Sequence, residues 1–152
     1  MEEVNVWMQE ALVQAQEALA QGEVPVGAVL VHQGKKLCAF GNRREADHDP
    51  TAHAEILCLR EGARLLDDWR MQDCTLYVTL EPCPMCAGAM VMSRLGKCVY
   101  GAPDPQKGCC GSVYDLPDDP ALGGQTQWEG GVMADACQEV LDAFFARRRK
   151  GD

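Results

Sequence analysis

Residues 74–86, CTLYVTLEPCPMC, set the interpretation of the chain, because an apolar run passes directly into a segment that begins like a helix. The run over 74–80 predicts a buried strand. Pro84 suits the first helical position and puts Cys83 at the N-cap, with Cys86 one turn further on. A strand leading into a helix start is typical of α/β folds, whose active groups gather at such junctions.

Strand and helix patterns alternate on both sides of this junction. Apolar residues at helical spacing predict a first helix over 4–19, which Gly22 ends. The pair Asp49-Pro50 predicts the start of a helix that runs to residue 66, with Asp49 as N-cap, after a polar loop. Further strands are expected at 24–31, 36–41, 97–102 and 111–116, and further helices at 84–95 and from about 133 onwards. This order predicts a three-layer α/β/α domain on a mixed five-stranded sheet.

The composition is that of a globular protein. The chain has 152 residues, 47% hydrophobic and 24% charged, which suits one domain over residues 1–152. There is no apolar run near the roughly 18 residues that span a bilayer, and the acidic N-terminus is unlike a signal peptide, so we expect a cytoplasmic protein that contacts no membrane. Nine cysteines then indicate buried and metal-binding thiols in a reducing compartment.

The charge is acidic overall and basic at one end. The net charge of −9 disfavours non-specific nucleic-acid binding through the overall field. Arg147, Arg148, Arg149 and Lys150 nevertheless follow one another near the C-terminus. Such a run is usually a solvated helix end, but it also permits a local basic patch.

The Cys-x-x-Cys pair has two open interpretations by itself. Helix starts favour thiolates, because unpaired backbone N–H groups and the positive end of the helix dipole lie there. Thiolates are ligands for zinc and are equally the reactive form of a redox dithiol. Two merely structural cysteines are a weaker explanation, because a proline stands between them at a helix start. The motif alone does not distinguish a metal site from a redox dithiol.

The segment His53-Ala54-Glu55 decides between them. It lies in the first turn of a helix, where a metal near the helix axis is within reach of residues two apart. His-x-Glu followed by Pro-Cys-x-x-Cys resembles the signature of zinc nucleobase deaminases. The resemblance implies one zinc ion per subunit, held by His53, Cys83 and Cys86. It makes Glu55 the catalytic acid and base, and three protein ligands are typical of catalytic zinc.

The chain also resembles the bacterial tRNA-specific adenosine deaminases over nearly its whole length. The matching segments are EVPVGAVLV, GNR, HDPTAHAEI, TLYVTLEPCPMCAGAM, SR, GAPD, GSVYDL and the terminal FF with arginines. This resemblance implies the cytidine-deaminase-like fold and a homodimer. It also implies conversion of adenosine to inosine at the wobble position of a tRNA anticodon stem-loop.

The resemblance assigns further residues to substrate binding. Asn42 matches a polar contact to the flipped base, with Val26, Pro25 and Ala54 around the pocket. Asp104 matches a contact to the anticodon backbone, and the C-terminal helix brings Phe144, Phe145, Arg148 and Arg149 to the RNA. At least one of the two phenylalanines is expected to pack on the core. The backbone carbonyl of Glu81 is expected to accept a hydrogen bond from the leaving amine.

Several positions depart from the family pattern. Gly123 and Gly124 replace an Asn-His pair that many members carry, and Pro103 and Pro105 flank Asp104. Cys109 and Cys110 are interpreted as incidental thiols rather than a second metal site. Two alternatives stay open, which are a deaminase of free guanine or cytosine and a zinc-stabilised RNA-binding module. Glu55 argues against the module, because a binding protein needs no acid beside an open zinc position.

Overall fold

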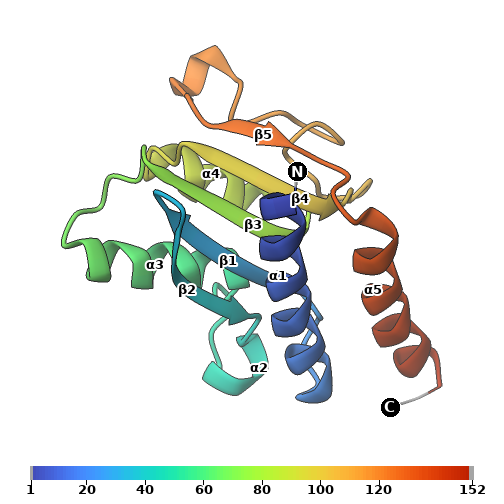
Figure 1. The fold of residues 1–152 in the computed structure, drawn as a ribbon. Coiled ribbons are helices and arrows are strands. Elements are labelled where there is room, and N and C mark those ends of the chain that lie inside the picture. Colours follow the sequence, from blue (N-terminus) through green and yellow to red (C-terminus); the bar gives the residue numbers. More distant parts are fainter. Residues whose placement is uncertain (1, 151–152) are drawn as a thin grey trace.

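The computed structural model describes residues 2–150 and shows one mixed five-stranded sheet with helices on both faces (Figure 1). Met1, Gly151 and Asp152, which the predicted domain includes, lie outside the described residues. The strand order is β2-β1-β3-β4-β5. The strands are β1 (Gly27–His32), β2 (Lys35–Gly41), β3 (Cys74–Leu80), β4 (Lys97–Ala102) and β5 (Gln127–Glu129). The predicted α/β/α architecture is confirmed.

The pairing directions decide where the functional segments meet. Strand β1 is antiparallel to β2 and β3, whereas β3, β4 and β5 are parallel to one another. Leu80 pairs with Ala102 at the ends of β3 and β4. Because parallel strands end at the same edge of a sheet, the segments that follow them, 81–86 and 103–112, emerge side by side.

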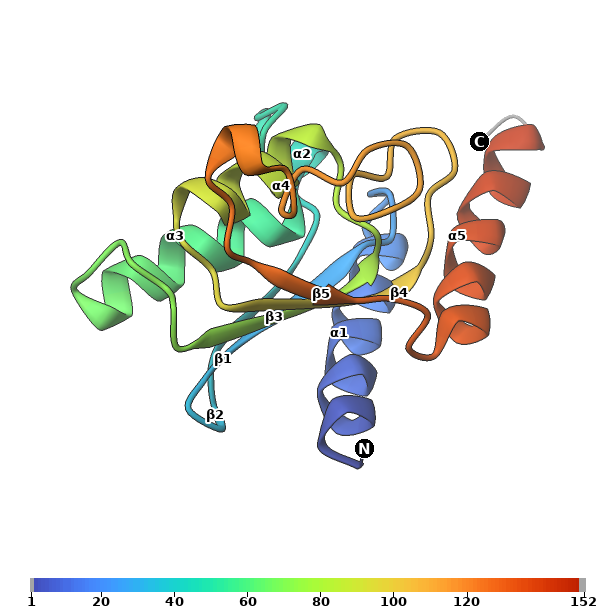
Figure 2. The same cartoon turned by 90° about the horizontal axis from the view of Figure 1, so that it is seen from above.

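Two helices cover each face of the sheet. Helices α1 and α5 lie on one face and α3 and α4 on the other, as two perpendicular views show (Figures 1 and 2). Side chains alternate between the two cores, so that Leu30 faces α3 and α4 whereas Val29 faces α1. The helices are α1 (Glu2–Ala20), α2 (Arg44–Asp47), α3 (Ala54–Leu66), α4 (Pro84–Met92) and α5 (Ala134–Arg149), with a 3-10 turn at Pro120–Leu122. No helix within residues 2–150 is long and apolar enough to cross a membrane.

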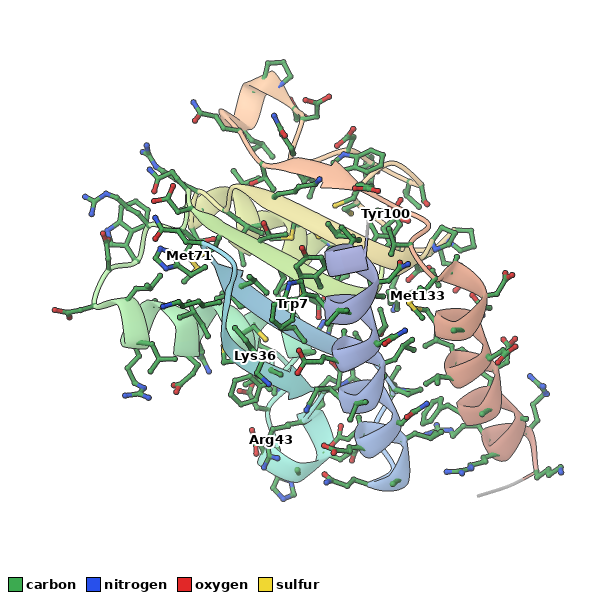
Figure 3. The ribbon with its side chains drawn as sticks, viewed as in Figure 1. Trp7, Lys36, Arg43, Met71, Tyr100 and Met133 are labelled. Carbon is green, nitrogen blue, oxygen red and sulfur yellow. The ribbon has the colours of Figure 1, made fainter. Side chains whose placement is uncertain are left out.

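Glycines allow the helices of one face to approach the sheet closely. A Cβ at Gly27 would overlap the carbonyl oxygen of Ala11, and one at Gly101 would overlap the thiol of Cys137. Helix α1, which carries Trp7, therefore lies directly on β1 (Figure 3). Helix α5 is held against β4 in the same way, and this contact brings its middle part beside the ends of β3 and β4.

The start of helix α3 differs from the prediction. The helix begins at Ala54 with His53 as N-cap, rather than at Asp49 and Pro50. The Asp49 carboxylate instead accepts hydrogen bonds from the amide and the hydroxyl of Thr51, both at 2.8 Å. This local turn competes with helix formation. In addition, residues 44–47, predicted as part of a loop, form the short helix α2.

The fifth strand was also predicted in the wrong place. It is β5 (Gln127–Glu129), whereas residues 111–116 form no strand and only Cys110 and Asp115 make an isolated bridge. The amides of Cys110 and Ser112 donate to the carboxylate of Glu81 at 2.9 and 3.0 Å. A backbone donor that is used by a side chain is not available to a neighbouring strand.

Candidate active site

Two helix starts bring three ligand-type side chains together. His53 is the N-cap of α3, and Cys83 is the N-cap of α4 with Pro84 at its first helical position. The Nδ1 atom of His53 lies 3.6 Å from the Cys83 sulfur and 3.5 Å from the Cys86 sulfur. Within residues 2–150 these three are the only group of three or more His, Cys, Asp or Glu side chains that could hold one metal ion, and their ligand atoms all lie within 4.8 Å of one another.

The spacing of these atoms suits zinc. Ligands at about 2.3 Å for sulfur and 2.0 Å for nitrogen, at a tetrahedral angle, are about 3.5 Å apart. The nitrogen-to-sulfur separations of 3.5 and 3.6 Å agree with that value. Two thiols with one imidazole are a donor set that zinc prefers, and they leave its fourth position open for water. The cluster therefore has the residues and the spacing to hold one zinc ion.

Ionisation of the cluster also favours a bound cation. Contact with Cys86, and then with His53, lowers the pKa of the Cys83 thiol to about 4. Contact with Cys83, and then burial, raises the pKa of Cys86. The contact with Cys83 also raises the pKa of His53. By itself the cluster thus favours one thiolate, and a divalent ion supplies the positive charge that allows the second.

Glu55 is the second residue of α3, and its carboxyl group faces the cluster with one oxygen that has no protein partner. Its side chain is 3% exposed, and its Oε1 is the one buried side-chain polar atom of the described residues that lacks a hydrogen bond. Burial raises the pKa of this carboxyl group. A buried carboxyl group with a raised pKa and a free oxygen is suited to carry a proton to and from a bound molecule.

Asn42 connects the cavity wall to the helix that carries these residues. Its side-chain Oδ1 accepts a hydrogen bond from the Ala54 backbone amide at 2.8 Å, and its backbone N–H donates to the carbonyl of Val26 at 3.0 Å. The first bond satisfies an otherwise unpaired N–H at the start of α3. It also fixes the plane of the side-chain amide, so that the NH₂ group is turned away from the helix.

These groups open into a cavity of about 650 Å³, within the size range typical of small-molecule sites. Its wall combines six parts of the chain, namely the starts of α3 and α4, the segment before β1, residues 42–44, the segment after β4, and helix α5. The lining residues include Val26, Asn42, Arg44, His53, Glu55, Glu81, Cys83, Asp104, Lys107, Gln138 and Phe145.

The match to a protein family covers both helix starts. Residues 1–102 match the model of the cytidine and deoxycytidylate deaminase zinc-binding region. The chain belongs to this deaminase family. The sequence resemblance is thereby confirmed, and the match includes His53, Glu55, Cys83 and Cys86.

Relatives within and around the family are similar over nearly the full length. A tRNA-specific adenosine deaminase of Bacillus subtilis (strain 168) is 44% identical over 150 residues, which are 99% of this chain and 93% of the relative. A solved structure from a study of A-to-I editing by tRNA:A34 deaminases at the wobble position superposes with a TM-score of 0.86 and 38% sequence identity. The match covers 89% of this chain and 98% of the chain in that structure.

A guanine deaminase from Nitrosomonas europaea shares the fold at a lower level of identity. Its sequence is 22% identical and its structure superposes with a TM-score of 0.80. The match covers 93% of this chain and 84% of the guanine deaminase chain. At that identity the likeness establishes the architecture of this deaminase and not its substrate. The α/β/α fold therefore occurs in proteins with different substrates, and the residues of the cavity wall determine which substrate this chain binds.

The structure places the predicted substrate residues in different environments. Val26, Asn42, Glu81, Asp104 and Phe145 line the cavity. Pro25 and Ala54 are buried beneath the wall, and Phe144 packs in the core, as expected for one of the two phenylalanines. Arg148 lies over the Phe144 ring at 5.6 Å, and Arg149 is exposed; neither lines the cavity.

Other lining residues were not singled out from the sequence. Arg44, Lys107 and Gln138 line the cavity, from α2, the segment after β4, and α5. Arg44 stands two positions after Asn42 and Lys107 three after Asp104, so proximity to the matching segments was an available signal. Gln138 carries no such signal, because only the packing of α5 brings it to the cavity.

Proposed function

We propose that this chain hydrolytically deaminates adenosine to inosine at the wobble position of a tRNA anticodon. The observation that carries the proposal is the unpartnered buried oxygen of Glu55 beside the His53, Cys83 and Cys86 cluster, at the base of an open cavity. Similarity over 99% of the chain to a tRNA-specific adenosine deaminase supports the substrate. The described residues would act as one catalytic domain.

The residues around the cluster have separate roles in this reaction. His53, Cys83 and Cys86 would hold zinc, which when bound supplies a water activated for attack by lowering its pKa to about 7. Glu55 takes a proton from that water and passes it to a ring nitrogen of the base, which makes the amine-bearing carbon electrophilic. The remaining hydroxide adds to that carbon. The same carboxyl group then carries the proton of the added hydroxyl to the amine, which leaves as ammonia while the C–O bond becomes a carbonyl.

The deep part of the cavity suits a single base. Asn42 is fixed by its bond to the Ala54 amide, so its NH₂ group is ready to donate to an acceptor on the base without reorganising. Val26 contributes an apolar surface to the same wall. A wobble base is already unpaired in an anticodon loop, so its transfer into such a pocket costs less than extraction from a duplex.

The cavity mouth has the groups that an RNA strand requires. Arg44 and Lys107 are exposed, and no ion pair is recorded for either among residues 2–150, although the chain as a whole is acidic. Phe145 is 47% exposed and lines the cavity. Cationic groups with an exposed aromatic ring are the combination that single-stranded nucleic acid binds. This local patch supports an anticodon stem-loop as partner, and a substrate of that kind supports a cytoplasmic location.

A homodimer is supported by the outer side of α4. This helix is apolar on both sides, since Met90 is fully buried whereas Met92 is 76% exposed. Trp69, also exposed, lies 5.8 Å beneath the guanidinium group of Arg94, two residues after Met92. An exposed apolar side on a helix is typical of an association surface. Analytical ultracentrifugation of the protein and of a Met92→Lys variant would test this, and a monomeric parent protein would contradict it.

Substrate choice can be tested in one experiment. The purified protein is incubated with an anticodon stem-loop that bears adenosine at the wobble position and, separately, with free adenosine, guanine and cytosine. Inosine in the stem-loop alone is the expected result. Conversion of free bases only would favour a nucleobase deaminase, and RNA binding without conversion would favour the zinc-stabilised module. A stem-loop with adenosine moved one position away serves as the matched control.

A further inference from the structure

Glu81 is a buried carboxylate that the proposed reaction does not use. It follows β3 directly and stands two residues before Cys83, and its side chain is 2% exposed. Burial of an acidic side chain is costly unless its oxygens are hydrogen-bonded. Here every partner is a donor, and all of them come from the segment that follows β4.

The four donors divide between the two ends of that segment. Oε1 accepts from the Asp104 amide at 3.0 Å and from the Ser112 hydroxyl, and Oε2 accepts from the amides of Cys110 and Ser112 at 2.9 and 3.0 Å. The far end has further attachments, since the Tyr100 hydroxyl donates to the Cys110 carbonyl at 3.1 Å (Figure 3 labels Tyr100). The near end, at Asp104, is held by Glu81, and just beyond the turn the Cys109 amide also donates to the Pro82 carbonyl at 2.9 Å.

The near end is itself a self-contained turn. Asp104 Oδ1 accepts from the amides of Gln106 and Lys107 at 3.0 and 3.1 Å, and the Asp104 carbonyl accepts from the Gly108 amide at 2.9 Å. Gly108 packs against the Glu81 carboxyl group so closely that a Cβ there would overlap it. Residues 103–107 all line the cavity. A preformed turn in the cavity wall is thus seated on one buried carboxylate.

We propose that Glu81 is a positioning residue that places the 103–108 turn, and with it Lys107, against the RNA strand on either side of the reacting base. This inference rests on the proposed function and assigns Glu81 a side-chain role, in addition to the backbone contact expected from its sequence position. The carboxylate touches neither substrate nor metal. It acts through the turn, so its loss changes substrate binding more than the chemical step.

Glu81→Gln tests the proposal with little change of shape. An amide has a single acceptor oxygen, and its NH₂ group cannot accept from N–H donors. With the oxygen kept opposite the Cys110 and Ser112 amides, the NH₂ group faces the Asp104 amide, so the turn loses its hydrogen bond to this side chain. We expect KM for the stem-loop to rise about tenfold, the loss expected for one hydrogen bond to a charged group, with kcat within about threefold of the parent.

Two readouts separate positioning from general damage. Hydrogen–deuterium exchange of the 103–108 peptide should accelerate about tenfold or more in Glu81→Gln, while bound zinc per chain is unchanged. Thr79→Val is the matched control. Thr79 lies in β3, two residues before Glu81, and its hydroxyl accepts from the Gly27 amide at 3.1 Å without touching the turn. Its stability should fall while KM stays at the parent value.

A second substitution keeps Glu81 and moves the turn. Gly108→Ala inserts a Cβ against the Glu81 carboxyl group and should reproduce the rise in KM. It also stands in for Glu81→Gln if that variant does not fold. Unchanged KM in either folded variant, or equal loss of kcat and zinc, would overturn the proposal. An inactive parent protein would contradict the proposed function instead. In that case, faster hydrogen–deuterium exchange of the 103–108 peptide in Glu81→Gln, without any change in RNA binding, would identify the carboxylate as purely structural.

Discussion

The cluster of His53, Cys83, Cys86 and Glu55 and the mouth of the cavity above it are built in different ways. The cluster comes from two helix starts, and each start brings two of its members within three residues of one another in sequence. The mouth comes from α2, the turn after β4 and helix α5, which are far apart along the chain. Chemistry is thus held by short, rigid units, whereas recognition depends on how remote elements pack.

The largest effect should come from removing a ligand of the cluster. Cys86→Ala is expected to abolish both zinc binding and turnover, because two remaining ligands do not complete a catalytic site. Zinc per chain, measured by atomic absorption, and single-turnover deamination check this. Cys109→Ala is the matched control, since this thiol is buried near the cavity but outside the cluster. Equal loss of zinc from both variants would contradict the assignment.

Removing the proton carrier should spare the metal. Glu55→Gln is expected to lower kcat by about 10²–10⁴-fold, the usual contribution of general acid–base catalysis, with zinc retained. Glu61→Gln on the same helix, a partly exposed partner of Arg64 at 2.6 Å, should leave kcat unchanged. Turnover of Glu55→Gln close to that of the parent would show that another group moves the protons.

Two adjacent phenylalanines allow recognition to be separated from packing. Phe145→Ala should raise KM for the stem-loop about tenfold, the loss of one stacked base, without changing the melting temperature. Phe144 is 8% exposed, and Phe144→Ala should instead lower the free energy of unfolding by about 3 kcal/mol. Thermal melts and steady-state kinetics on both variants check the contrast. A rise in KM for Phe144→Ala with a loss of stability for Phe145→Ala would show that Phe144, and not Phe145, contacts the RNA.

The smallest effect should come from charges at the mouth. Arg44→Ala combined with Lys107→Ala is expected to reduce the slope of log affinity against log salt by about 1.4, if each side chain neutralises one phosphate of a single strand. The control is Lys35→Ala with Arg60→Ala, which removes the same charge from exposed positions outside the cavity wall. An equal change of slope in both would indicate that only net charge matters.

The contrast explains which predictions from sequence succeeded. Pro84 marked the start of α4 because proline is favoured at the first helical position, and the structure has it there. The same reasoning failed at Pro50, where the Asp49 side chain closes a local turn with Thr51 and delays the helix to Ala54. Both patterns are local, and at Pro50 the competing turn of Asp49 with Thr51 is the one that forms.

The fifth strand shows the same limit. Residues 111–116 have the composition of a strand, but Ser112 and the preceding Cys110 donate to a carboxylate 31 and 29 residues away in sequence. Strand β5 has three residues and is recognisable mainly through its parallel pairing with β4. Short strands carry little periodicity, so their place in a sheet depends on the partner.

The sequence by itself determined the family and the reaction, because His53, Glu55, Cys83 and Cys86 lie at two helix starts whose geometry is set by residues beside them. Tertiary structure alone decided the cavity wall. Parallel pairing of β3 and β4 sets Glu81 beside the 103–108 turn, and the contact of Gly101 with Cys137 sets α5 beside both. Such contacts join segments that share no local pattern, and their energy depends on the packing of the whole sheet.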